Sequence, residues 1–224
     1  MRSTHVACVG LVAILVACGG AVRSEDGEVT VEPAGVDPQG AQNAHDLHGS
    51  PEPGEAPMLG VHHSKEAGPP GKASTPGNMT WHGGAIMTDS VVKTIFWGSS
   101  WANAAFAGDK IDGLNRLYAG LASATSYVAS NTEYTGTNGQ VGTGVTYAGS
   151  VTDLAAGPRS APKTGAVLAE VCKMITNPVA NGYYPVYTDL KRGSAGYCAW
   201  HSYGSCSGTP VQFGFFFNLD GDAG

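Results

Sequence analysis

The chain has 224 residues, of which 42% are hydrophobic, and a formal net charge of −6 at pH 7. A net acidic chain with no run of basic residues lacks the positive surface that nucleic acids require, so we expect no nucleic-acid partner. Aromatic residues are placed unevenly, because every Phe, Trp and Tyr lies at or after Trp81. This distribution predicts a single globular domain, which follows an N-terminal segment that has no aromatic residues.

The first residues combine a basic start with a short apolar run. Arg2 precedes an apolar segment of about ten residues, which is typical of an export signal and too short to span a bilayer. Leu15-Val16-Ala17 then leads directly to Cys18, where a bacterial lipoprotein would be cleaved and lipidated. We predict a signal peptide at 1–17 and a lipid on Cys18, which places the protein in the cell envelope, outside the cytoplasm. The alternative is an ordinary secretory signal cut near Ala21.

Residues 18–78 have the composition of a solvated linker. Between Gly19 and Asn78 there are eight of the 13 prolines, no aromatic residue, and nine acidic against three basic residues. Such a segment buries too little apolar surface to offset the loss of chain entropy. We predict a disordered tether over 18–78, which separates the lipid from a globular domain at 79–224.

Within that domain the hydrophobic pattern alternates between strand and helix periods. Strands are predicted at 90–98, 183–190 and 210–219, helices at 109–121 and from Thr164 to the Asn177-Pro178 stop, and a hairpin at 134–149 around Asn138-Gly139. The pattern predicts an α/β or α+β fold, in which a mixed sheet of about five strands packs against two helices.

The last predicted strand is apolar at nearly every position from Val211 to Phe217. Strands of this kind are covered on both faces. Because only a few residues follow, we expect covering elements beyond Gly224 and a sequence that is incomplete at its C-terminus.

Cys198 and Cys206 enclose a short segment that contains Trp200 and His201. In an oxidising compartment this spacing predicts a Cys198–Cys206 disulfide. A zinc site formed by both thiolates and His201 is the alternative. Cys172 lies on the apolar side of the second helix, where it is either a buried thiol or the partner of a cysteine beyond Gly224.

The candidate catalytic residues are His201 and His82, each with a purely structural role as the alternative, and neither lies in a complete catalytic motif. Asp220 and Asp222 offer carboxylate oxygens on alternate residues after the last strand, which makes them candidate calcium ligands. The segment departs from the EF-hand pattern, so a plain acidic turn is the other interpretation. The cofactor expected from these residues is therefore calcium, zinc or none.

Four segments together resemble the phosphate-induced (EXORDIUM-like) family: Trp81-His82-Gly83-Gly84, Phe96-Trp97-Gly98, Asn131-Thr132-Glu133-Tyr134 and Gly196-Tyr197-Cys198-Ala199-Trp200-His201. The resemblance implies a secreted domain that acts outside the cytoplasm and has no established catalytic residues. Some bacterial relatives continue into a His-Glu helix that suggests a metalloprotease-like site, and no residue of this chain corresponds to it.

Two functions follow as hypotheses. In the first, the domain is a non-catalytic binding module that contacts an envelope glycan or a protein partner through exposed aromatic residues such as Trp81, Trp101 and Trp200. In the second, it is a metal-dependent hydrolase whose main ligands lie beyond Gly224, with His201 and the Asp220 region forming one wall of the site.

Overall fold

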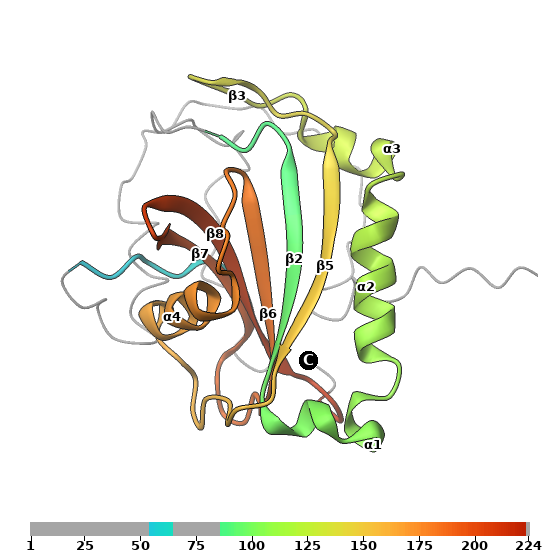
Figure 1. Ribbon diagram of the computed structural model, residues 1–224, viewed down its shortest axis with the longest axis vertical. Coiled ribbons are helices and arrows are strands. Elements are labelled where there is room, and N and C mark those ends of the chain that lie inside the picture. Colours follow the sequence, from blue (N-terminus) through green and yellow to red (C-terminus); the bar gives the residue numbers. More distant parts are fainter. Residues whose placement is uncertain (1–53, 65–85, 223–224) are drawn as a thin grey trace, which may run out of the picture.

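The computed structural model describes residues 54–64 and 86–222. They form a mixed α+β fold around a six-stranded sheet with the strand order β1-β7-β8-β6-β2-β5 (Figure 1). The strands of this sheet are β1 (Leu59–His63), β2 (Ser90–Trp97), β5 (Val145–Asp153), β6 (Gly182–Lys191), β7 (Tyr197–Cys206) and β8 (Thr209–Asn218). The predicted fold class is confirmed, with six strands in the sheet where about five were expected.

Four neighbouring strands, β5, β2, β6 and β8, run parallel to one another. β7 is antiparallel to β8, and β1 is antiparallel to β7. Parallel neighbours need long crossover connections. The connections from β2 to β5 and from β5 to β6 contain the helices, whereas the connection from β6 to β8 contains β7. β3 (Thr135–Gly136) and β4 (Gly139–Gln140) form a separate small hairpin that precedes β5 in the chain.

The crossover from β2 to β5 contains most of the helical segments, and the crossover from β5 to β6 contains α4 (Thr164–Met174). In the first crossover lie η3 (Ser99–Ala102), α1 (Ala104–Ala107), α2 (Lys110–Leu121), α3 (Thr125–Val128) and η4 (Ala129–Asn131). Figure 1 shows α2 beside β5 and α4 on the other side of the sheet. None of the helices in the described ranges is long and apolar enough to cross a membrane.

The main core lies between the sheet and α4. Val167 and Val171 of α4 pack against a row of fully buried side chains that come from adjacent strands, namely Ile95, Val186, Phe215 and Trp200. Register explains this row, because Ile95 is opposite Val186, Val186 opposite Phe215 and Phe215 opposite Trp200. Burying each of the larger side chains contributes about 1.5 to 3 kcal/mol.

The next residue along each strand faces α2, since side chains alternate between the two faces of a sheet. Phe96, Tyr187 and Phe216 form the corresponding row, with ring centroids 6.0 Å apart for the first pair and 4.6 Å apart for the second. Trp101 from η3 packs on Phe96 at 4.8 Å, and Tyr118 from α2 bonds to the hydroxyl of Tyr187. This second, smaller core holds α2 and η3 on the sheet.

The apolar strand near the C-terminus is β8, which lies inside the sheet between β7 and β6. Phe213, Phe215 and Phe217 are buried on the α4 side, and Phe216 stacks on Tyr187 on the other side. The strand prediction is confirmed, and α4 covers the face of β8 that carries Phe213, Phe215 and Phe217.

One part of the predicted tether belongs to the sheet. Residues 59–63 form β1, so the expectation of disorder over 18–78 is wrong for the described segment 54–64. Met58 and Val61 pack against the main core. A composition averaged over sixty residues hides these few apolar contacts, which explains the error.

The predicted disulfide is also corrected. Cys206 is bonded to Cys172 of α4, with the two α-carbons 5.1 Å apart, and Cys198 is buried. Cys198 and Cys206 lie near opposite ends of the single strand β7, which was not predicted. Eight residues of extended strand span about 26 Å, whereas a disulfide needs α-carbons about 4.4 to 6.8 Å apart.

Candidate functional site

The most distinctive surface feature of the described chain lies at the β1–β7 end of the sheet. Along β7 the side chains alternate, so that Trp200 and Ser202 are buried while His201 and Tyr203 are exposed. Leu59 of β1 lies opposite His201 and is also exposed. We call Leu59, His201 and Tyr203 the edge strip; the exposed fractions of Tyr203 and Leu59 are 48% and 39%.

β7 holds this strip on a rigid support. It is paired with β8 over most of its length, from Ala199 opposite Phe216 to Cys206 opposite Thr209. The Cys172–Cys206 disulfide ties its end to α4. Gly204 allows α4 to approach closely, because a β-carbon at this position would lie 2.5 Å from a methyl carbon of Leu168.

The segment that contains β1 is fastened at several points. The hydroxyl of Ser202 donates to the carbonyl of Pro57 at 2.7 Å, and the hydroxyl of Thr164 donates to the carbonyl of Ala56 at 2.6 Å. The carboxylate of Glu55 accepts a hydrogen bond from the backbone N–H of Gly165 in the first turn of α4. Such a bond satisfies one of the donors that a helix leaves without a partner at its N-terminus.

His201 lies over the backbone of β1. A β-carbon on Gly60 would come within 2.2 Å of Cε1 of His201, and the backbone of Gly60 has a φ of 52°, which glycine adopts without strain. Burial lowers the pKa of His201, and the nearby imidazole of His62 lowers that pKa further. The neutral ring is therefore favoured, and it can donate and accept hydrogen bonds at the surface.

A second polar region lies at the carboxyl ends of the parallel strands. The chain leaves β2 toward the α2 face and reaches β6 from the α4 face, so β2 and β6 form a switch point of the kind at which open α/β sheets bind ligands. Asp189 at this point accepts a hydrogen bond from the N–H of Ser100 at 2.9 Å. A β-carbon on Gly98 would lie 2.1 Å from its carboxylate, and one on Gly157 would lie 2.9 Å away. The carboxylate thus fills the space between these two loops and fixes them.

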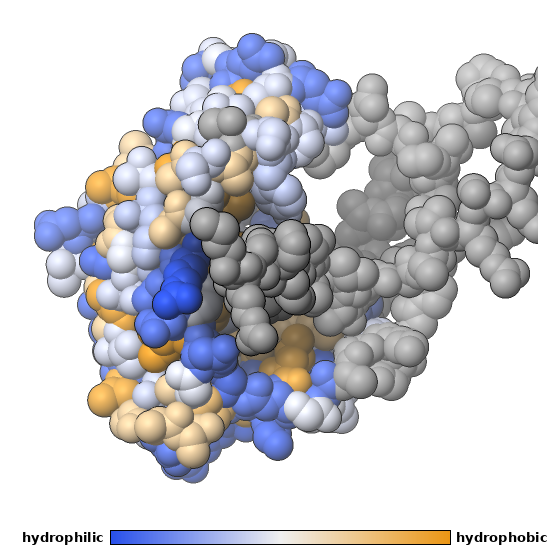
Figure 2. All heavy atoms as spheres, turned by 90° about the vertical axis from the view of Figure 1, so that its right-hand side faces the viewer, coloured by the Kyte–Doolittle hydropathy of each residue, from blue (hydrophilic) through white to orange (hydrophobic). Residues whose placement is uncertain are grey.

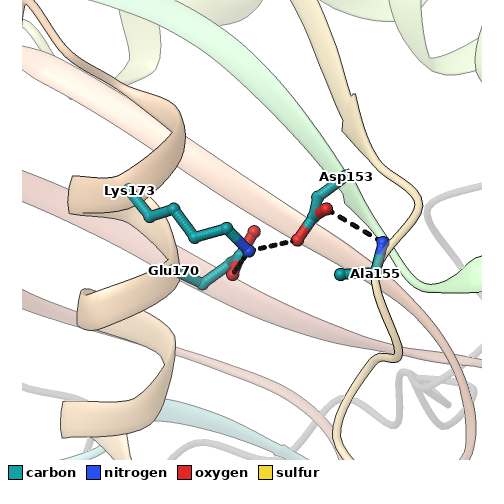
Figure 3. A network of polar contacts seen from close by, with 4 residues as sticks. All are labelled: Asp153, Ala155, Glu170 and Lys173. Atoms are coloured by element: carbon teal, nitrogen blue, oxygen red, sulfur yellow. Dashed lines mark hydrogen bonds and ion pairs between the residues drawn. The ribbon is translucent and has the colours of Figure 1, made fainter.

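Figure 3 shows a polar network beside the same edge, where Lys173 of α4 reaches both Asp153 and Glu170. Its ammonium group lies 3.0 Å from Glu170, and Asp153 also accepts from the N–H of Ala155. The hydrogen bond from Lys173 lowers the pKa of Asp153, whereas burial raises the pKa of Glu170. The network joins α4 to the end of β5.

Burial also raises the pKa of three phenols on the α2 face, Tyr118, Tyr183 and Tyr187. The hydroxyls of Tyr118 and Tyr187 are 2.8 Å apart. Their burial and this contact show that these tyrosines belong to the packing of α2 on the sheet. On the surface seen from the side where α2 lies in Figure 1, the hydrophobic residues of the described chain are scattered among hydrophilic ones (Figure 2).

The candidate metal ligands at the C-terminal end have cationic partners. Asp220 forms an ion pair with Lys110, and Asp222 forms two hydrogen bonds with Arg192 at 2.7 and 2.9 Å. Among the residues that the structure describes, no group of three His, Cys, Asp or Glu side chains is placed to hold a metal ion. These contacts favour the interpretation as an acidic turn.

The remaining predicted site residues are not brought together. His201 lies opposite Gly214, about 13 Å of extended strand before the end of β8, where the loop with Asp220 begins. Trp101 and Trp200 are 7% and 2% exposed, so neither offers the expected aromatic surface. His82, Trp81 and Cys18 lie outside the described residues.

Sequence reasoning missed Tyr203 and Leu59. The alternation of buried and exposed side chains in Trp200-His201-Ser202-Tyr203 is a strand signal, but the two cysteines led to its interpretation as a disulfide loop.

No family model, characterised protein or solved structure with which we compared this chain matches it.

Proposed function

We propose that this chain is a lipid-anchored binding module of the cell envelope and that it contacts another envelope component through the edge strip. The observation that supports this function is Tyr203, a large side chain that is 48% exposed on a rigid strand beside the exposed His201. Most tyrosines of the domain lie in or near the cores. An aromatic residue that the fold leaves exposed on a strand is available for contact with a partner.

The chemistry of the strip suits recognition. A tyrosine supplies a large contact area at little cost in side-chain entropy, and its hydroxyl supplies a polar contact. His201 adds a donor and an acceptor, and Leu59 adds an apolar contact beside it. Since the β7 backbone is already fixed, binding requires little ordering of the protein.

Two features support a location outside the cytoplasm. The Cys172–Cys206 disulfide is of a kind that persists in oxidising compartments. The sequence Leu15-Val16-Ala17-Cys18 fits lipid attachment, which would keep the domain at a membrane surface. The proposed relation to the phosphate-induced (EXORDIUM-like) family agrees with an extracytoplasmic role.

Photo-crosslinking in intact cells tests the proposal. The full chain carries a photoreactive amino acid in place of Tyr203, and a matched control carries it in place of Tyr127, which is 60% exposed on α3. We expect a discrete crosslinked product from position 203 and none from position 127. Equal products from both positions, or none from 203, would overturn the proposal.

The anchor has a separate test. Cys18→Ala should release the protein from the membrane fraction and abolish labelling with a fatty-acid analogue. Labelling that survives this substitution would show that the lipid is elsewhere or that the protein has none.

A further inference from the structure

The strands that surround the edge strip contain no carboxylate, ammonium or guanidinium group. β1, β7 and β8 have no Asp, Glu, Lys or Arg, and neither has the turn between β7 and β8. By contrast, β2, β5 and β6 each contain at least one such residue. The fold also favours the neutral ring of His201. An ionic partner loses water on binding and needs an opposite charge in return, so these strands favour an uncharged partner.

Several polar side chains on this face have unused hydrogen-bonding groups. Gln212 of β8 lies opposite Tyr203 and Gly214 lies opposite His201, and register partners point to the same face of the sheet. A β-carbon on Gly214 would lie 2.7 Å from the hydroxyl of Tyr183, so this hydroxyl lies over the backbone of β8 at the position opposite His201. Within the described ranges, no hydrogen bond is formed by the side chains of Tyr183, His201, Tyr203 and Gln212.

The exposed ring of Tyr203 is the large apolar element among these groups. His201 lies two residues before it, about 7 Å along an extended strand, and Gln212 lies directly across the strand pair. One aromatic ring and two polar groups within this span match the dimensions of a sugar unit. A sugar has an apolar face of C–H groups, which packs on the negative face of an aromatic ring, and its hydroxyls both donate and accept hydrogen bonds.

The same surface fits a protein partner less well. The strongest contacts of protein interfaces are Trp, Tyr and Arg side chains enclosed at the centre of a well-packed patch. The edge strip offers one tyrosine and one leucine, exposed by 48% and 39%. Its phenol, imidazole and amide groups each need a hydrogen-bonding partner when they are covered, and a glycan supplies hydroxyls for this purpose on every sugar unit.

We propose that the edge strip, together with Gln212 and the hydroxyl of Tyr183, is a binding site for an uncharged polysaccharide of the cell envelope. A sugar ring stacks on Tyr203, and its hydroxyls bond to His201 and Gln212. β1 remains paired with β7 and contributes Leu59 to the contact. This inference rests on the proposed function, because it names the chemical class of the partner that the edge strip contacts.

Cosedimentation of the full chain, kept in a mild detergent, with insoluble envelope material tests this inference. The probe is the envelope of the native cells after extraction with detergent and digestion with protease, which leave the polysaccharide. We expect the unmodified chain to sediment with it. The bound fraction should change little between about 0.05 and 0.5 M NaCl, because salt screens only charged contacts. No binding, or binding that is lost as salt is added, would overturn the inference.

Matched variants locate the site, and thermal unfolding establishes that each is folded. Tyr203→Ala removes the stacking ring and should weaken binding by about tenfold or more, whereas Tyr203→Phe keeps the ring and should weaken it by about threefold at most. Gln212→Leu preserves the size of the side chain but removes its hydrogen bonds, so it should weaken binding by about threefold or more. Tyr127→Ala, at an exposed tyrosine of α3, is the control and should bind like the unmodified chain. Folded Tyr203→Ala that binds as tightly as the control would overturn the inference.

The photo-crosslink at position 203 separates this inference from the proposed function. A crosslinked product whose added mass is carbohydrate, as shown by sugar analysis, supports both. A product whose added mass is polypeptide leaves the binding function intact and overturns the polysaccharide as the partner. The absence of any product overturns the proposed function itself.

Discussion

The disulfide between Cys172 and Cys206 joins the last turn of α4 to the final residue of β7. It closes a loop with a sequence separation of 34 residues, which contains all of β6. The bond therefore fixes the helix to the strand that carries the edge strip.

Replacement of both bonded cysteines by alanine should lower the free energy of unfolding by about 3 to 4 kcal/mol in the loop-entropy model. Chemical denaturation measures this difference, and the reduced unmodified chain should behave like the variant. Mass mapping of an unreduced digest should link the peptides that contain Cys172 and Cys206. A peptide linked through Cys198 would contradict the structure.

Removal of the cation between Asp153 and Glu170 should destabilise the fold. Lys173→Met leaves the carboxylates of Asp153 and Glu170 beside each other without their cation, and Glu170 is only 5% exposed. We expect a loss of about 1 to 3 kcal/mol, less than for a fully buried pair because the Lys173 side chain is 53% exposed. Thermal unfolding at pH 7 measures the loss, and Lys191→Met is the control on an exposed lysine. Equal stability of the two variants would show that the network contributes nothing.

The predicted core elements follow from local patterns. Ser90–Trp97, Lys110–Leu121 and Thr209–Asn218 form as expected because each has an unbroken strand or helix period. β1 was missed because its pairing with β7 depends on residues more than a hundred positions away, and local composition carries no signal of such a contact.

The site was less accessible to prediction than the fold. Trp200 was expected at the surface, yet it lies in the same row as Phe215 and is buried. The face toward which a strand residue points depends on register, and a shift of one residue reverses it. Likewise, Asp220 could be recognised as an oxygen donor from the sequence, but its partner Lys110 is brought near only by the fold.

The hydroxyl pair on the α2 face provides a matched test of packing. Tyr187→Phe removes the hydrogen bond to the hydroxyl of Tyr118, a residue that is 8% exposed. We expect a loss of about 1 to 2 kcal/mol, since a buried hydroxyl loses its partner. Tyr127→Phe, at a residue that is 60% exposed, should change the stability by less than about 0.5 kcal/mol. Urea unfolding compares the two, and equal effects would argue against the hydrogen bond.

Attachment of β1 should depend on pH through His201. Burial and the neighbouring His62 lower the pKa of His201 in the folded chain below the value of about 6.5 that it has when unfolded. Because the folded chain favours the neutral ring of His201, this residue contributes stability at pH values above its unfolded pKa. That contribution is lost as the pH falls through the folded pKa. Protonation of His201 places a positive charge at the β1–β7 pairing, so β1 should loosen as the pH falls below the unfolded pKa of about 6.5.

Hydrogen–deuterium exchange at pH 7.5 and pH 5, corrected for the intrinsic rate of each amide, measures this loosening. Protection of residues 59–63 should fall at pH 5 while protection of β8 is retained, because β8 lies inside the sheet. His201→Gln has a side chain of similar polarity that does not ionise, and it should remove most of the difference between the two pH values. If the variant loses protection in β1 to the same extent as the unmodified chain, then protonation of His201 does not control the attachment of β1.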